Sequence, residues 1–129
     1  AVHVPAAVAW SACEASTVTL TPNAAQIEAM SDPVKATAFA RMENHFFVHR
    51  GWWEEGQLIA GVDAIRHIPT VIVQGRHDVV TPMMTAWDLH RAWPEAELVV
   101  VDDAGHAATE PGTKKALRAA TDRFARAAR

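Results

Sequence analysis

The sequence predicts an α/β protein in which a helical segment precedes parallel strands with flanking helices. Helical periodicity dominates residues 1–62, whereas short β-branched runs occur in residues 63–129. Two of these runs, 70–73 and 98–101, are apolar without alternation, which is typical of parallel strands that are covered on both faces. A helical pattern follows each run, so the order strand, helix, strand, helix describes a βαβ unit and one further helix.

Helices account for the first half of the chain, and we expect three of them. The first covers residues 1–17. Thr21 and Pro22 are typical of the N-cap and the first position of a second helix, which runs to Met30.

The third helix has the same start signal, because Asp32 directly precedes Pro33. Gly51 is a natural end for it. The spacing i, i+3, i+7 predicts an apolar stripe on its core-facing side, formed by Phe39, Met42 and Phe46.

The second half supplies two helices and an incomplete sheet. One helix is expected over residues 82–93, where Pro94 ends it, and a surface helix over residues 113–128. The two strands leave both edges of their sheet unpaired, and an isolated parallel pair buries too little to be stable alone. We therefore expect another polypeptide or a second copy of the chain to complete the sheet.

The composition excludes several classes of protein. Half of the 129 residues are hydrophobic, enough for a core, so a disordered chain is not expected. A formal charge of -3 with 12 basic residues gives no electrostatic footprint for nucleic acid or an anionic membrane. Neither a signal peptide nor a membrane span is expected. Cys13 is the only cysteine, which excludes an intrachain disulfide and suits a cytoplasmic location.

Two polar residues follow the expected strands at their carboxyl ends, where open α/β sheets place catalytic groups. Asp78 lies three residues beyond Gly75, and His106 directly follows Gly105. Adjacent parallel strands lie about 4.8 Å apart, so the two side chains can reach one another. An aspartate bonded to a histidine fixes the imidazole tautomer and stabilises its charged form. The sequence therefore predicts a catalytic acid–base pair. The alternative is that Asp78 is a turn or cap residue before the helix that begins near Pro82 and that His106 is an ordinary loop histidine.

Four segments of the chain resemble the later part of proline iminopeptidases, which are serine peptidases of the α/β-hydrolase fold. They are ARMENHFF (40–47), IPTVIVQGRHD (68–78), AWPEA (92–96) and DAGHA (103–107). The resemblance implies that residues 1–62 belong to a helical cap and residues 63–129 to the C-terminal part of the hydrolase domain. It also implies that Asp78 is the triad acid and His106 the triad base. The acid precedes the histidine, as in the chain order nucleophile, acid, histidine of α/β hydrolases.

The same resemblance implies a substrate site in the cap. Glu14 and Glu43 resemble the glutamates that hold the positively charged amine of an N-terminal proline. Glu43 also has phenylalanines one turn away on its helix, where an unpaired carboxylate is costly and a cationic partner relieves the cost. Pairing of Glu43 with an arginine, or its exposure to water, is an equally good interpretation of the sequence alone.

The expected protein is the cap and C-terminal portion of an enzyme that releases N-terminal proline from peptides. Its nucleophilic serine lies outside the chain, because no Gly-x-Ser-x-Gly sequence is present. The expected partners are a peptide with an N-terminal proline and either the N-terminal portion of the enzyme or a second chain. Nucleic acid, membranes and cofactors are not expected as partners.

The sequence is compatible with three other interpretations. The chain resembles other capped α/β hydrolases in its acid and histidine, so an esterase or epoxide hydrolase is an alternative. A non-catalytic, truncated chain that pairs with another polypeptide is a second alternative. His45 and His49 are spaced i, i+4, but no third ligand accompanies them, so we interpret them as structural and expect no metal.

Overall fold

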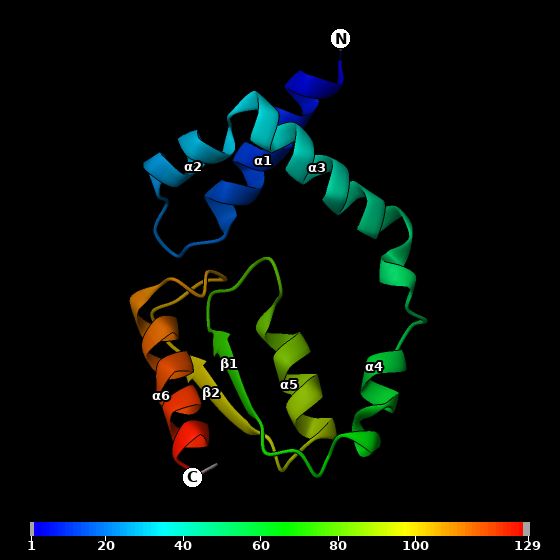
Figure 1. The fold of residues 1–129 in the computed structure, drawn as a ribbon, viewed down its shortest axis with the longest axis vertical. Coiled ribbons are helices and arrows are strands. Elements are labelled where there is room, and N and C mark those ends of the chain that lie inside the picture. The colour runs from blue at the N-terminus through cyan, green and yellow to red at the C-terminus, as the bar shows by residue number, and fades with distance from the viewer. Residues whose placement is uncertain (1, 128–129) are drawn as a thin grey trace. The chain divides into compact units, whose positions relative to one another are not determined.

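A computed structural model of the chain describes residues 2–127 (Figure 1). The chain divides into two units. The first contains the chain up to Thr17 together with Thr21–Gln57, and the second contains Val18–Leu20 and the chain from Leu58 onwards. None of the helices within residues 2–127 combines the length and the apolar character that a membrane crossing needs.

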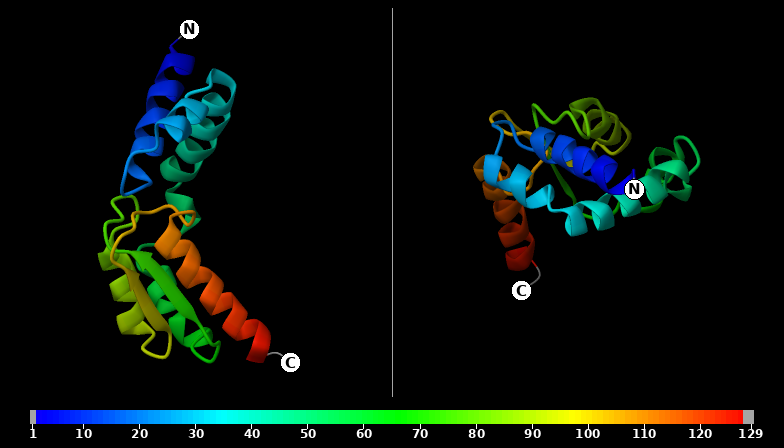
Figure 2. Two further views of the ribbon diagram at one scale, coloured as in Figure 1. Left: turned by 90° about the vertical axis from the view of Figure 1, so that its left-hand side faces the viewer. Right: turned by 90° about the horizontal axis from the view of Figure 1, so that it is seen from above.

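The first unit is helical, as predicted. Helix α1 (His3–Thr17) packs against α2 (Ala24–Met30) and lies beside α3 (Pro33–Val48) (Figure 2). A short 3-10 helix, η1 (Arg50–Trp52), follows α3. The one-turn helix α4 (Gln57–Ala60) then begins at the last residue of this unit.

The N-caps explain where α2 and α3 begin. Asp32 caps α3 as predicted, because its carboxylate accepts two backbone N–H groups of the first turn and Pro33 is the first helical residue. The predicted start of α2 at Thr21 is wrong by two residues. Asn23 caps this helix instead and accepts the backbone N–H of Gln26 at 3.2 Å, since asparagine is a stronger N-cap than threonine.

The apolar stripe predicted for α3 does not face the core of this chain. Met42 and Phe46 are 61% and 54% exposed, whereas Ala36 and Ala40 are buried. Small side chains let two packed helices approach closely, and α1 also buries only small residues: Ala7, Ser11 and Ala15. The Ser11 hydroxyl donates to the carbonyl oxygen of Ala36 at 3.4 Å, so the buried polar group is satisfied.

A left-handed turn follows α3, which ends shortly before the predicted Gly51. Arg50, Gly51 and Trp52 have φ angles of 51°, 60° and 61°. Only glycine adopts such angles without steric cost, so the other two residues need compensating contacts. The Trp52 ring makes such contacts, because it stacks on His49 with centroids 5.4 Å apart and meets the edge of Phe46 at 5.1 Å.

The second unit contains the predicted βαβ unit. Strands β1 (Val71–Gly75) and β2 (Glu97–Val101) form a parallel two-stranded sheet and begin and end opposite one another. Helix α5 (Met83–Ala92) connects them, and α6 (Pro111–Ala127) follows β2. The two helices lie on opposite faces of the sheet (Figure 2). A 3-10 turn, η2 (Val62–Ala64), precedes β1.

The core of this unit is small. Trp93 packs against Val62 and Ala96, and its indole N–H donates to the carbonyl oxygen of Arg66 at 3.2 Å. Among the described residues, most buried apolar side chains are alanines. Besides Trp93 and Val62, only Val101 is larger than alanine. The sheet within residues 2–127 has two strands, so each strand has one edge without a strand partner.

Candidate active site

The candidate site lies in the loops that leave the carboxyl ends of β1 and β2. The two loops are joined by backbone hydrogen bonds, because Arg76 donates to Val101 at 2.9 Å and His77 donates to Ala104 at 3.0 Å. A Cβ atom at Gly75 would overlap the backbone of the facing loop, so this position requires glycine. The close approach of the loops places the residues that follow them side by side.

This arrangement brings the predicted pair together. Nδ1 of His106 lies 3.0 Å from Oδ2 of Asp78. The Asp78 side chain is 5% exposed, whereas that of His106 is 38% exposed. No residue in 2–127 forms a hydrogen bond with Nε2 of His106, so this nitrogen is free to act as a base towards an incoming group.

The Asp78 carboxylate is held by several further donors. Oδ1 accepts the backbone N–H groups of Val80 at 2.9 Å and Thr81 at 2.8 Å. Oδ2 accepts the Thr81 hydroxyl at 2.9 Å and the Gln74 amide at 3.2 Å. Burial acts to raise the pKa of Asp78, but the hydrogen bonds from the Thr81 backbone, His106 and the Thr81 hydroxyl outweigh it and lower the pKa below its usual value.

The backbone around His106 is fixed from a distant part of the chain. His106 and the next residue both donate their backbone N–H to the carbonyl oxygen of Val18, at 3.0 and 2.7 Å. The Glu110 carboxylate accepts the N–H of Gly105 at 2.7 Å and that of Leu20 at 2.8 Å. The histidine loop is therefore held on both sides of His106.

Three residues of this site were not identified from the sequence. Gln74 and Thr81 contact Asp78, and Glu110 fixes the loop before His106. A weak signal was available for Thr81, since a hydroxyl three residues after an aspartate can bond to it locally. The sequence holds no comparable signal for Glu110, because one of its partners lies 90 residues away.

The first unit contains the predicted substrate residues. Glu43, on α3, accepts the indole N–H of Trp10, on α1, at 2.6 Å. Glu14 lies one helical turn after Trp10, and its carboxylate has no hydrogen bond within residues 2–127. No ion pair joins Glu43 to an arginine in that part of the chain. The two glutamates thus lie on packed helices of one unit, whereas Asp78 and His106 belong to the other.

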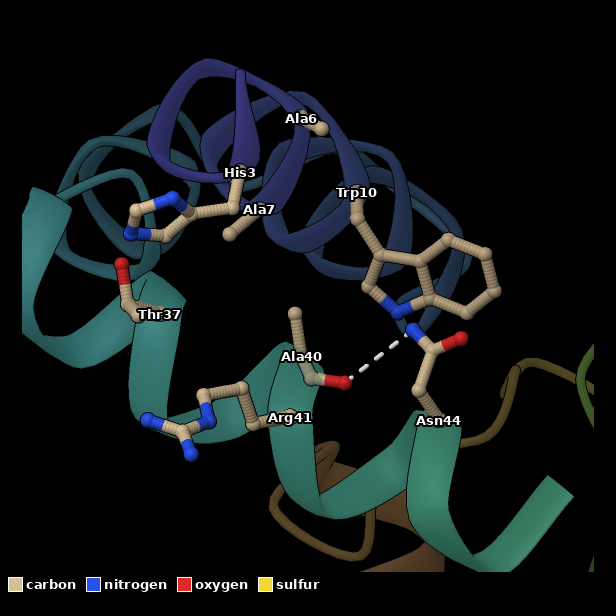
Figure 3. A pocket seen from close by; sticks show the side chains of 8 residues that line it. All are labelled: His3, Ala6, Ala7, Trp10, Thr37, Ala40, Arg41 and Asn44. Atoms are coloured by element: carbon tan, nitrogen blue, oxygen red, sulfur yellow. Dashed lines mark hydrogen bonds between the residues drawn. The ribbon is translucent and has the colours of Figure 1, made fainter. Parts of the chain in front are cut away.

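An open groove of about 460 Å³ runs between α1 and α3 (Figure 3). It is lined by His3, Ala6, Ala7, Trp10, Thr37, Ala40, Arg41 and Asn44. Trp10 belongs to the groove and also bonds to Glu43, so the carboxylate adjoins this apolar surface.

The histidines at 45 and 49 form an aromatic cluster with Trp52. The rings of His45 and His49 lie 4.8 Å apart, and His49 is stacked on Trp52. Within residues 2–127, no three His, Cys, Asp or Glu side chains are grouped to hold a metal ion.

Comparison with known proteins defines the class. A family model described as TAP-like protein, of the α/β-hydrolase group, matches residues 51–129. The chain belongs to this family, and its parallel strands with flanking helices form the C-terminal part of an α/β-hydrolase domain.

Among named relatives, the chain is similar to proline iminopeptidases. It is 50% identical over 124 residues to the proline iminopeptidase of Arabidopsis thaliana, covering 95% of this chain and 33% of that protein. It is 52% identical over 120 residues to the probable proline iminopeptidase of Leptolyngbya boryana, covering 92% and 37% of the two chains. It is 48% identical over 125 residues to the proline iminopeptidase of Xylella fastidiosa (strain Temecula1), covering 96% of this chain and 40% of that protein. The chain thus spans between a third and two fifths of the length of these relatives.

Proposed function

We propose that the chain is the cap and C-terminal portion of a proline iminopeptidase, which releases N-terminal proline from peptides. The observation that carries the proposal is the hydrogen bond between the buried Asp78 and the partly exposed His106. The names of the relatives support the particular activity. In this proposal residues 1–62 form the helical cap, residues 63–129 belong to the hydrolase domain, and the enzyme is cytoplasmic.

In the proposed mechanism, a serine in the N-terminal portion of the enzyme attacks the carbonyl carbon of the N-terminal proline. Nε2 of His106 takes the serine proton and then donates it to the leaving amine. Asp78 accepts a hydrogen bond from Nδ1 and stabilises the imidazolium. Its carboxylate is ionised at neutral pH, because its hydrogen bonds hold the pKa of Asp78 below the usual value. Water then hydrolyses the prolyl ester of the serine with the same histidine as base.

Glu43 and Glu14 are proposed to bind the positively charged imino group of the substrate. Glu43 has the stronger support, because the Trp10 indole fixes one of its oxygens and leaves the other available to a cation. Binding the imino group positions the scissile carbonyl and discriminates against peptides without a free N-terminus.

Hydrolysis of proline arylamide by the complete enzyme tests the proposal. We expect turnover that falls by about a thousandfold or more in His106→Ala, because the base is lost. His67→Ala, which removes an exposed histidine elsewhere in the second unit, should leave turnover unchanged. The 129-residue chain alone should show no turnover above background. It has neither the Gly-x-Ser-x-Gly turn that carries the nucleophile nor the His-Gly-Gly type loop that supplies an oxyanion donor. Turnover by this chain alone that His106→Ala abolishes would contradict the proposal.

Two other functions are tested by the same preparation. An acid–histidine pair on this fold also suits an esterase or an epoxide hydrolase, so ester and epoxide substrates belong in the assay. Higher kcat/KM on an ester or epoxide than on proline arylamide would favour those activities. Inactivity of the complete protein on every substrate would favour a non-catalytic chain that serves to pair with another polypeptide.

A further inference from the structure

We propose that Thr81 is a positioning residue of the acid–base pair, whose hydroxyl holds Asp78 in place and helps to set the hydrogen bonds of the His106 ring. The inference deepens the proposed function and rests on it for the activity measurement, although not for the spectroscopic one. The Thr81 hydroxyl contacts Asp78 and His106, and its proposed role is exerted through these two residues.

Three atoms of the site lie within hydrogen-bond distance of one another. The Thr81 hydroxyl oxygen lies 2.9 Å from Oδ2 of Asp78 and 3.2 Å from Nδ1 of His106, and these two atoms are 3.0 Å apart. A hydroxyl has one proton to donate, whereas an ionised carboxylate can only accept. The proton of Thr81 is therefore directed to Asp78, and a lone pair of the hydroxyl oxygen faces the imidazole.

This arrangement selects one tautomer of His106. With the Thr81 proton on the side of Asp78, both oxygens near Nδ1 are acceptors, so Nδ1 must carry the ring proton. Nε2 is then unprotonated in the neutral ring and can accept a proton from the nucleophile. Thr81 thus adds a second acceptor that favours the tautomer the proposed mechanism needs.

The backbone keeps the Thr81 hydroxyl in this position. The N–H of Thr81 donates to Oδ1 of Asp78 at 2.8 Å, and its carbonyl oxygen accepts the Gln74 side-chain amide at 3.0 Å. Thr81 is therefore fixed at both its N–H and its carbonyl, and Gln74 links it back to β1.

The Thr81 hydroxyl and the imidazole share one oxygen of Asp78, because both bond to Oδ2. Within residues 2–127, Asp78 is the one charged side chain in contact with the His106 ring, and the nearby Glu110 carboxylate is engaged by two backbone N–H groups. Without the Thr81 hydroxyl, Oδ2 has one donor fewer and becomes a stronger acceptor for the imidazolium. The loss of the hydroxyl oxygen as a second acceptor near Nδ1 acts in the opposite sense, so the balance of hydrogen bonds to the His106 ring changes.

The test compares Thr81→Val, which keeps the shape but removes the hydroxyl, with Thr81→Ser, which restores it. Both substitutions are made in the complete enzyme. Thr121→Val is the matched control, because it removes a hydroxyl that bonds only to carbonyl oxygens of α6. The first measurement is the pH titration of His106 followed by NMR of protein labelled with ¹⁵N-histidine. The second is kcat/KM on proline arylamide as a function of pH.

We expect the His106 titration and the acid limb of the kcat/KM profile to shift together in Thr81→Val. The plateau value of kcat/KM should fall about tenfold, since a hydrogen bond to a charged group is lost. Thr81→Ser should restore both, and Thr121→Val should change neither. If Thr81→Val does not fold, Thr81→Ala provides a second variant without the hydroxyl.

A His106 titration that is the same in Thr81→Val as in the unsubstituted protein would overturn the inference, and so would failure of Thr81→Ser to restore it. The NMR titration needs no substrate. Absence of prolyl hydrolysis in the complete enzyme would therefore contradict the proposed function, while the titration would still decide the role of Thr81.

Discussion

At the scale of single residues, Asp78 connects the geometry of the site with the stability of the protein. Its buried carboxylate receives five hydrogen bonds, two of them from backbone N–H groups of the next turn. The sequence left two interpretations open, a turn or cap residue before the next helix and a triad acid. Oδ1 accepts two N–H groups of the turn, while the N-cap residue of the helix itself is Pro82. Oδ2 faces the imidazole, so the triad role remains a prediction that the geometry permits.

The low pKa of Asp78 predicts how stability depends on pH. A carboxyl group whose pKa is lower in the folded than in the unfolded state stabilises the fold above its unfolded pKa, about 4, and loses this contribution as pH falls through the folded value. We expect Asp78→Asn to lower the free energy of unfolding by about 1–3 kcal/mol near neutral pH, because its amide group opposes the donors of the site.

Denaturant unfolding of both proteins between about pH 7 and about pH 3 checks this expectation. The difference between the two should shrink towards the acid end. A difference that stays constant over the whole range would mean that ionisation of Asp78 does not contribute. Asp102→Asn provides the comparison, since Asp102 forms an exposed ion pair with Arg76 in the same pair of loops.

Glu43 gives a second prediction at this scale. Glu43→Gln removes the negative charge and keeps nearly the same shape, and a charge-assisted hydrogen bond is worth about 1.5–3 kcal/mol. In the complete enzyme, kcat/KM on proline arylamide should fall about tenfold or more, whereas hydrolysis of a small neutral ester should hardly change. Glu14→Gln and Trp10→Phe, which removes the indole N–H that fixes Glu43, should act in the same direction but less strongly.

The two substrates separate the possible roles of Glu43. An equal loss on both would mean that Glu43 supports the structure of the helices. No loss on either would mean that it is a solvated residue of α3. The control is Glu28→Gln, which removes an exposed glutamate from α2 of the same unit.

At the scale of elements, the order of helices and strands was predictable because it depends on local signals. The cap at Asp32 and the β-branched strands are patterns of neighbouring residues. The face of α3 that packs on α1 was not predictable in this way. Its large apolar residues suggested one side, but Ala36 and Ala40 allow the close approach of the helices, which depends on the partner helix as much as on α3.

The loop that carries His106 depends on Glu110, which gives a prediction for this element. A glutamine at position 110 has one oxygen to accept the N–H of Gly105 or Leu20, and its amide group would face the other donor. We expect Glu110→Gln to cost about 1–2 kcal/mol of stability and to speed hydrogen exchange at both amides. Unchanged exchange at Gly105 and Leu20 would show that Glu110 does not fix the loop.

At the scale of the whole molecule, most buried residues within 2–127 are small and many large apolar ones are exposed. Phe47, Trp52 and Trp53 are each more than half exposed, as are Leu58 and Met84. Large apolar side chains that are exposed in such numbers are typical of surfaces that another polypeptide covers. The short length of the chain relative to its relatives gives the same indication. The sequence predicted this incompleteness from the two unpaired strands.

The open strand edges predict how the chain behaves in solution. An unpaired edge of β1 or β2 has free backbone donors and acceptors that can pair with any available strand. The core of the second unit is small, so it stabilises the isolated two-stranded sheet only weakly. We therefore expect the 129-residue chain alone to sediment as a dimer or larger aggregate at micromolar concentration. Addition of the N-terminal portion of the proposed enzyme should convert it to a one-to-one complex, because that portion is proposed to supply the neighbouring strands. A stable monomer with a cooperative thermal transition would contradict this expectation, since it would mean that two parallel strands and their helices suffice for an independent fold.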